Sequence, residues 1–132
     1  MKKIEDVDPA KLYEQMKNVM ALDIKRTIIP IPYMGNRTAV IDYETKELIA
    51  LCPMTGLPDF YKLTIIFIPD DFIPELKSLK MYFYRYLTIG ITHEHLATKI
   101  YNDFMAMIVP NELNIKLIAN IRGGIQSTVI IN

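Results

Sequence analysis

The chain has 132 residues, with 15 Lys and Arg against 15 Asp and Glu, and it contains a single cysteine. This length fits one domain with a modest core, and one thiol excludes an internal disulfide framework and an all-cysteine metal site. A formal net charge of zero gives no general attraction to nucleic acid, although it leaves room for a local basic patch.

The N-terminal part of the sequence predicts a helix followed by an extended segment. Residues 8–23 carry apolar side chains at helical spacing. These positions are Leu12, Met16 and Met20. Residues 25–35 are apolar, but two prolines restrict them to an edge strand or an extended arm. We therefore divide the chain into an N-terminal helix and arm, residues 1–35, and a main domain, residues 36–132.

The next segments predict strands. Residues 38–52 have the pattern of a β-hairpin, with strands at 39–43 and 48–51 on either side of a polar turn. After a turn rich in Pro, Thr and Gly, residues 61–70 predict a strand that is apolar on both faces.

Two helices follow these strands. Residues 74–87 show helical spacing of apolar side chains, at Leu76, Leu79, Phe83 and Tyr86. Thr92 is a suitable N-cap for a second helix, which Pro110 ends. The inner stripe expected on that helix is Leu96, Ile100, Phe104 and Met107.

The C-terminal part predicts a second hairpin around an Arg-Gly-Gly turn, with strands in residues 113–121 and 125–132. With the hairpin of residues 38–52 counted as one β unit, the order β, β, α, α, β, β predicts an α+β fold, in which a four-stranded antiparallel sheet carries two helices on one face. The last strand is apolar to its end. An exposed edge of this kind favours aggregation, so we expect another subunit to cover it.

The sequence also indicates a compartment. No apolar run is long enough for a membrane span, and no signal-peptide pattern follows the two N-terminal lysines. We expect a soluble cytoplasmic protein, in which reducing conditions keep the free thiol of Cys52 intact.

The stretch CPMTGLPDF contains Cys52 and Asp59. A lone cysteine is often a small core side chain, but one at the end of a strand beside a turn is accessible and can react when ionised. Asp59 is either the paired acid or base of that thiol or a turn carboxylate that binds backbone amides. Spacing alone leaves both alternatives open.

His93 and Glu94 begin the helix that Thr92 caps. A histidine at a helix start can donate protons into a cleft, whereas Glu94 also suits the positive end of the helix dipole. The sequence HEHLA is not the zinc motif H-E-x-x-H, so we expect no metal here. We expect His95 to be a surface residue.

Lys77 and Lys80 stand three residues apart, on one face of the predicted helix. They are either a phosphate-binding pair or part of an ordinary solvated helix face. The chain has no G-x-G-x-x-G motif, so a dinucleotide would not bind in the Rossmann manner.

Three ordered motifs resemble one family. CPMTGLPDF matches its pattern Cys-Pro-x-Thr-Gly-x-Pro-Asp-Phe, ELKSLKMY (residues 75–82) matches its NADPH signature, and the His-Glu pair follows at the family's distance. From about residue 36 to the Arg-Gly-Gly turn, the chain resembles the 7-cyano-7-deazaguanine reductases of queuosine biosynthesis. These are the QueF family of nitrile reductases, here in the short single-module form.

The resemblance implies a chemistry. Cys52 would attack the nitrile carbon of 7-cyano-7-deazaguanine and form a covalent thioimide. Asp59 would transfer protons, His93 would supply protons or position the cofactor, and Glu94 would bind the guanine-like edge of the base. Two NADPH molecules would then deliver hydrides in succession, which gives 7-aminomethyl-7-deazaguanine.

The resemblance also implies a cofactor site and an assembly. Lys77 and Lys80, helped by Ser78 in the signature that Glu75 opens, would face the phosphates of NADPH, and Arg122 is a further candidate. The family has the tunnelling fold, whose subunits join their sheets into a barrel-like ring with the substrate between neighbours. Single-module members form pentameric rings stacked as decamers, so we expect a homo-oligomer.

Some residues depart from the family pattern. Leu87 and Thr88 stand in place of an Arg-Asn pair, and Thr92 replaces an aromatic residue before the His-Glu pair. A threonine cannot stack on a purine-like ring, so the departure at Thr92 changes how the base would be held.

Two alternatives remain. The archaeal QueF-like enzymes add ammonia to the nitrile on tRNA, which makes the amidine of archaeosine, and they lack the lysine signature. The retained ELKSLKMY therefore favours reduction, and tRNA is a partner only under this alternative. The other alternative is a non-catalytic protein that binds a deazapurine or forms a structural ring. Cys52 and Asp59 argue against it, because binding alone requires no nucleophile.

Overall fold

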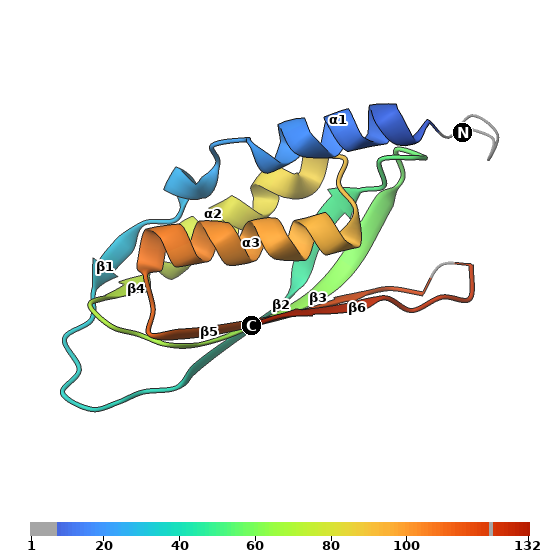
Figure 1. Ribbon diagram of the computed structural model, residues 1–132. Helices are drawn as coiled ribbons and strands as arrows, with labels where there is room; N and C mark the ends of the chain where they lie inside the picture. Colours follow the sequence, from blue (N-terminus) through green and yellow to red (C-terminus); the bar gives the residue numbers. More distant parts are fainter. Residues whose placement is uncertain (1–7, 122) are drawn as a thin grey trace.

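The computed structural model describes residues 8–121 and 123–132. Its main sheet is antiparallel, with the strand order β2-β3-β5-β6. The strands are β2 (Ile41–Leu51), β3 (Pro58–Ile68), β5 (Glu112–Ala119) and β6 (Thr128–Ile131). The helices α1 (Pro9–Met20), α2 (Leu76–Tyr84) and α3 (His93–Ile108) lie on one side of this sheet (Figure 1). The predicted α+β fold with a four-stranded antiparallel sheet is confirmed.

Four short elements complete the description. They are the 3₁₀ helices η2 (Lys25–Thr27) and η3 (Arg85–Thr88) and the strands β1 (Pro30–Pro32) and β4 (Phe72–Pro74). β1 pairs antiparallel with β4, which joins the N-terminal arm to the segment before α2. Because proline cannot donate a backbone hydrogen bond, two prolines suit so short a strand at an edge. The division of the chain at residue 35 stays a prediction.

The helix predicted within residues 8–23 is α1, and α3 begins and ends as its sequence predicts. Asp8 caps α1 by accepting a hydrogen bond from the backbone N–H of Ala10, and Thr92 caps α3 by accepting one from His95. Val109 ends α3 in the left-handed region, with φ of 50°, immediately before Pro110. Within residues 8–121 and 123–132, no helix combines the length and the apolar character that crossing a membrane requires.

The predicted hairpin within residues 38–52 is wrong. β2 runs unbroken from Ile41 to Leu51 and pairs along its length with β3. Between Thr45 and Leu48 the register shifts, because β2 advances three residues while β3 advances two. The polar run therefore forms a β-bulge instead of a turn. The hydroxyl of Thr45 accepts a hydrogen bond from the backbone N–H of Glu47 and stabilises this bulge.

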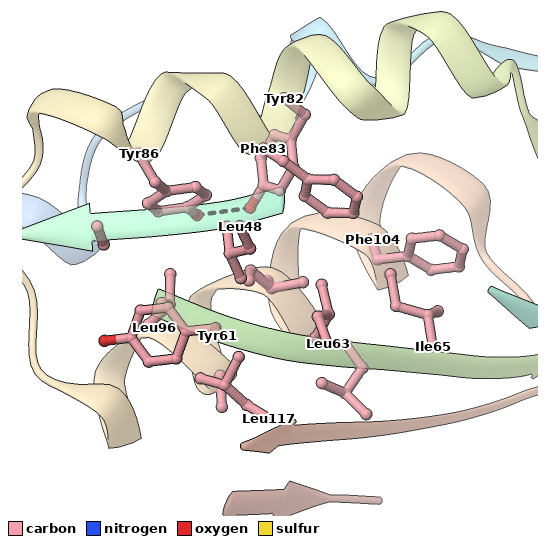
Figure 2. Close-up of a cluster of buried hydrophobic side chains, with 14 of the residues drawn as sticks. Leu48, Tyr61, Leu63, Ile65, Tyr82, Phe83, Tyr86, Leu96, Phe104 and Leu117 are labelled. Carbon is pink, nitrogen blue, oxygen red and sulfur yellow. Dashed lines mark hydrogen bonds between the residues drawn. The ribbon is translucent and has the colours of Figure 1, made fainter. Parts of the chain in front are cut away.

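The core lies between the sheet and the helices. Alternate residues of β3 point toward the helices and are buried, and side chains of α2 and α3 cover them (Figure 2). The stripe predicted within residues 74–87 is correct for Leu79, Phe83 and Tyr86, which are buried, but wrong for Leu76, which is 58% exposed. Leu76 is the first helical residue, so its side chain lies at the end of the helix, and Tyr82, which the predicted stripe left out, is fully buried.

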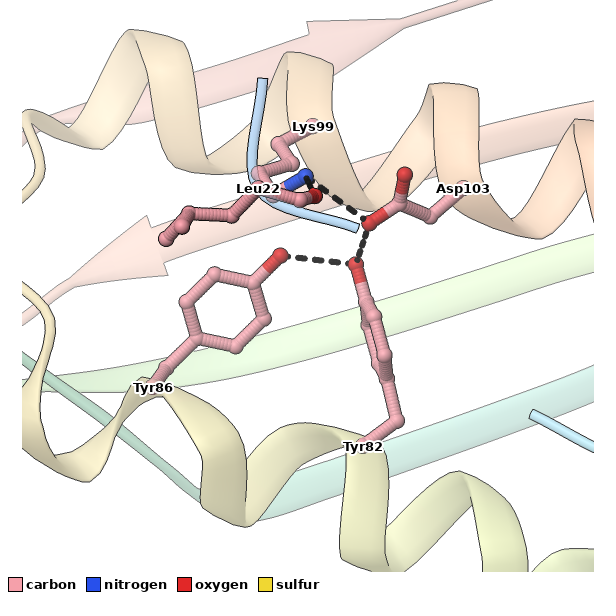
Figure 3. Close-up of polar contacts among 5 residues, drawn as sticks. All are labelled: Leu22, Tyr82, Tyr86, Lys99 and Asp103. Carbon is pink, nitrogen blue, oxygen red and sulfur yellow. Dashed lines mark hydrogen bonds and ion pairs between the residues drawn. The ribbon is translucent and has the colours of Figure 1, made fainter. Parts of the chain in front are cut away.

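A polar network, which we did not predict, lies buried between α2 and α3 (Figure 3). The Tyr82 hydroxyl donates to Asp103 Oδ2 at 2.7 Å and lies 2.7 Å from the Tyr86 hydroxyl. Lys99 Nζ lies 3.3 Å from Asp103 Oδ2 and donates to the Leu22 carbonyl at 2.8 Å. The network ties α2, α3 and the segment after α1 together. Buried charges are tolerated only when they are paired in this way.

Candidate active site

The turn between β2 and β3 holds Cys52 by its backbone. The N–H of Cys52 donates to the carbonyl of Leu57 at 2.8 Å, and the N–H of Gly56 donates to the carbonyl of Cys52 at 2.8 Å. Gly56 has a φ of 72°, a conformation that glycine adopts without strain. The side chain of Cys52 is half-buried. The turn therefore presents the thiol on a fixed backbone without sealing it in the core.

The end of β2 lies against the segment before α3. The N–H of Leu51 donates to the carbonyl of Ile89 at 2.9 Å, and the N–H of Ile91 donates to the carbonyl of Leu51 at 3.0 Å. A β-carbon on Gly90 would lie 3.5 Å from the α-carbon of Pro53, an ordinary van der Waals distance, so the two segments lie side by side at this point. This contact places the Cys52 turn beside the start of α3.

Side chains from the turn, β3 and α3 line one pocket of about 180 Å³. The lining residues are Cys52, Pro53, Met54, Asp59, Ile91, Thr92, His93 and Glu94. The structure thus brings together all four residues that we predicted for catalysis and substrate binding. They combine a thiol, two carboxylates and an imidazole, which suffice for nucleophilic attack with proton transfer.

Asp59 and His93 form the polar centre of this pocket. Asp59 Oδ2 lies 3.5 Å from His93 Nε2, and the Asp59 side chain is 7% exposed against 28% for His93. The ring of Tyr61, two residues after Asp59 on the same face of β3, meets the imidazole edge to face. Our sequence reasoning missed Tyr61, although its alternation with Asp59 was a usable signal.

Thr92 has a structural task in this pocket. Its hydroxyl accepts a hydrogen bond from the backbone N–H of His95 at 3.3 Å and lies 2.5 Å from the His95 Nδ1. His95 is exposed, as predicted, and so is Glu94. The first turn of α3 therefore keeps its own cap while it presents His93 and Glu94 to the pocket.

The residues of the lysine signature at the start of α2 have two different environments. Glu75 caps the helix by accepting hydrogen bonds from the N–H groups of Lys77 at 2.6 Å and Ser78 at 2.9 Å. The buried hydroxyl of Ser78 donates to the Glu75 carbonyl and accepts from the N–H of Ile29. Lys77 and Lys80 are exposed. Glu75 and Ser78 therefore build the start of the helix, and the two lysines project into solvent.

A second hollow, of about 390 Å³, lies between β2 and α2. Lys80 is at its rim, with Nζ 3.8 Å from Glu47 Oε2 and 5.9 Å from the centre of the Tyr84 ring. Asp42 and Glu44 also line the hollow, so carboxylates outnumber the cation there. Arg122, the remaining residue predicted for the cofactor, lies outside the described residues.

A family model described as QueF-like protein matches residues 58–132, more than half of the chain. The chain belongs to the QueF family. The predicted family membership is thus confirmed.

Curated members of the QueF family cover most of the chain. A protein of Chlorobium chlorochromatii (strain CaD3) is 37% identical over 97 residues, which are 74% of this chain and 84% of the relative. A protein of Syntrophus aciditrophicus (strain SB) is 43% identical, over 71% of this chain and 67% of its own length. A third, from Caldicellulosiruptor bescii, is 40% identical over 77% of both chains. Each of these relatives is named NADPH-dependent 7-cyano-7-deazaguanine reductase.

A solved structure has the same fold as this QueF family member. The archaeosine synthase QueF-Like in its apo form superposes with a TM-score of 0.63, over 74% of this chain and 93% of that one. Its sequence identity is 16%, so the likeness concerns the fold alone.

Proposed function

We propose that this chain reduces the nitrile of 7-cyano-7-deazaguanine to a primary amine with two NADPH, in the queuosine modification of tRNA. The convergence of Cys52, Asp59, His93 and Glu94 on one pocket carries the proposal. Relatives at 37–43% identity that are named for this reaction support it. A reactive thiol without a disulfide partner suits the reducing cytoplasm, where we place the enzyme.

In the proposed first step, Cys52 acts as the nucleophile. The sulfur–carbon bond forms at the nitrile carbon, one π bond of the nitrile breaks, and its electron pair moves to nitrogen, which takes up a proton. The product is a thioimide, and no group leaves. Asp59, nearly buried in the same pocket, accepts the thiol proton and returns it to the nitrogen.

His93 and Glu94 have separate tasks in this scheme. The imidazole of His93, between Asp59 and the open side of the pocket, exchanges protons with the reacting nitrogen. Glu94 is exposed at the rim, where its carboxylate can accept two hydrogen bonds from the N–H groups of a guanine-like edge. The base would be oriented by these bonds, since Thr92 offers no ring for stacking.

The residues of α2 fit a phosphate-bearing cofactor. Lys77 and Lys80 are exposed cations on a helix that Glu75 and Ser78 fix at its start. NADPH, when bound, supplies the hydride for each of two reductions. The carboxylates of Asp42 and Glu44 would repel a diphosphate, so the phosphates would lie on the lysine side of the hollow.

An assembly would complete the site. The pocket of about 180 Å³ is smaller than the roughly 300–1,000 Å³ of typical ligand sites. On the sheet face away from the helices Phe60 is 43% exposed, and on the edge strand β6 Ile130 is 56% exposed. A ring of subunits joined through their sheets, pentameric or decameric, would cover this surface and enlarge the pocket with residues of a neighbour.

A coupled assay tests the proposed function. The purified protein is mixed with 7-cyano-7-deazaguanine and NADPH, and the nicotinamide absorbance is followed together with the amine product. We expect two NADPH to be consumed for each amine formed. If the nitrile base disappears without loss of NADPH, or if neither reactant changes, nitrile reduction is wrong.

One observation favours a second candidate, the transfer of ammonia to the nitrile on tRNA. Thr92 replaces the aromatic residue of the reductase pattern and is engaged in capping α3. The assay separates the two candidates when tRNA carrying the nitrile replaces the free base. An amidine formed from ammonia, with NADPH unchanged, would support the second candidate.

A further inference from the structure

Tyr61 lies directly beside the imidazole of His93. The two ring centres are 5.3 Å apart, and the ring planes meet at 86°. This is the edge-to-face arrangement that aromatic rings prefer, and it contributes about 0.5–1.5 kcal/mol beyond area burial. Tyr61 and Asp59 alternate along β3, so both face α3. β3 thus contacts His93 through two side chains, the aromatic ring of Tyr61 and the carboxylate of Asp59.

The Tyr61 ring is itself held firmly. Tyr61 is 2% exposed and lies opposite Leu48 on β2 and Ala119 on β5, both buried. Figure 2 shows Tyr61 within the packed cluster of core side chains. Because strands flank Tyr61 on both sides, its ring is a rigid surface for any side chain that rests on it.

The contact with Asp59 alone does not fix the imidazole plane. Its distance of 3.5 Å exceeds the roughly 2.7–3.2 Å of a well-formed hydrogen bond. The side chain of His93 is 28% exposed, so solvent lies on one side of the ring. A second contact is required if Nε2 is to remain directed at the carboxylate, and the Tyr61 ring is that contact.

We propose that Tyr61 is a positioning residue, whose ring holds the imidazole of His93 with Nε2 toward Asp59 and the remaining edge toward the Cys52 pocket. The expected effect of Tyr61 on kcat rests on the proposed nitrile reduction. Its effect on the orientation of His93 does not, because that orientation can be measured in the free protein.

The test compares Tyr61→Leu, which removes the ring, with Tyr61→Phe, which keeps it. A matched control is Phe67→Leu, because Phe67 is equally buried on the same face of β3 but packs against Phe104, away from the pocket. For each variant the ¹⁵N and ¹H resonances of the His93 ring are recorded in the free protein. kcat and KM are then measured with 7-cyano-7-deazaguanine and NADPH.

In Tyr61→Leu we expect the two ring nitrogens of His93 to move toward the shifts of a freely rotating imidazole. We expect kcat to fall about tenfold while KM for the base changes by less than about twofold. Tyr61→Phe and Phe67→Leu should keep the wild-type resonances and kcat. If Tyr61→Leu does not fold, Tyr61→Met replaces it with the same expectations, because its unbranched, flexible side chain has a similar volume to leucine but extends farther into the space of the ring.

Unchanged His93 resonances in the folded ring-deleted variant would overturn the positioning role, and so would an equal change in Phe67→Leu. If the wild-type protein does not reduce the nitrile, the proposed function fails, yet the resonances still decide whether Tyr61 orients His93.

Discussion

His93 Nε2 lies 3.5 Å from Asp59 Oδ2, although α3 supplies one side chain and β3 the other. The contact joins the helical layer to the sheet at the pocket that Cys52 also lines. The Asp59 carboxylate is almost completely buried, whereas the His93 imidazole is partly exposed. A proton can therefore pass through this pair between the protein and a bound deazaguanine.

Replacing Asp59 with Asn should slow the formation of the covalent adduct by about 10²–10³-fold, because the amide keeps the shape but cannot accept the thiol proton. Stopped-flow absorbance with 7-cyano-7-deazaguanine measures this rate. Asp42→Asn is the matched control, since Asp42 is an exposed carboxylate that lines the other hollow. Adduct formation at the wild-type rate in Asp59→Asn would exclude the proton-transfer role.

Replacing Cys52 with Ala should abolish the adduct and leave the fold intact, because the side chain is half-buried and its turn is held by backbone hydrogen bonds. Intact-protein mass spectrometry after mixing with the nitrile base measures the adduct. In the wild type the added mass should equal that of the base, since no group leaves in the addition. The same added mass in Cys52→Ala would show that the nucleophile is another residue.

Lys77→Ala and Lys80→Ala should each raise KM for NADPH about tenfold, with KM for the nitrile base unchanged. A hydrogen bond to a charged group contributes about 1.5–3 kcal/mol when buried and less on an exposed helix. Steady-state kinetics with each reactant varied in turn separate the two constants. Lys17→Ala on α1 is the matched control, because Lys17 is also an exposed lysine. Equal effects on both constants would contradict phosphate binding by these lysines.

Replacing Asp103 with Ala should lower the free energy of unfolding by about 3 kcal/mol. The buried ammonium of Lys99 would then keep the Leu22 carbonyl but lose the only carboxylate paired with it among the described residues. Urea unfolding followed by circular dichroism measures this change. The double variant Lys99→Met/Asp103→Leu should recover most of the loss, since it removes both charges. Asn102→Ala, at the exposed neighbouring position, should change stability by less than about 0.5 kcal/mol. A small loss in Asp103→Ala, similar to that of the control, would contradict the stabilising role.

The same network predicts a loss of stability at alkaline pH. Burial raises the pKa of Tyr82 well above its ordinary value of 10.0, and burial also raises the pKa of Tyr86. The folded protein therefore keeps protons that the unfolded chain releases. The free energy of unfolding is unaffected by these groups below about pH 10 and falls as the pH rises above it.

Urea midpoints at about pH 8 and about pH 11 measure this dependence. The double variant Tyr82→Phe/Tyr86→Phe should show a smaller fall between the two values, because it has no buried phenol at these positions to ionise. An equal fall in the wild type and the double variant would assign the alkaline transition to other groups.

The sequence by itself was sufficient for the two longer helices and for the fold class. Helical spacing predicted α1 and α3, and for α3 Thr92 as N-cap and Pro110 after the end supported it. The order of elements predicted the sheet with its helices on one face. The limits of a helix depend on contacts within one turn, which the order of residues determines directly, and the sheet was inferred from the succession of elements.

The sequence motifs named the four polar residues of the pocket, but the tertiary structure alone decided which other polar side chains are buried and what they contact. Glu75 and Ser78 belong to the same short motif as Lys77, yet Glu75 caps α2 and the buried hydroxyl of Ser78 binds the backbone of Glu75 and Ile29. β2 stays one strand because β3 pairs with both its halves. The Lys99–Asp103 pair and the contact of Tyr61 with His93 likewise join different elements or meet inside the core. The burial and partners of a side chain depend on the elements packed against it, and no local pattern contains that information.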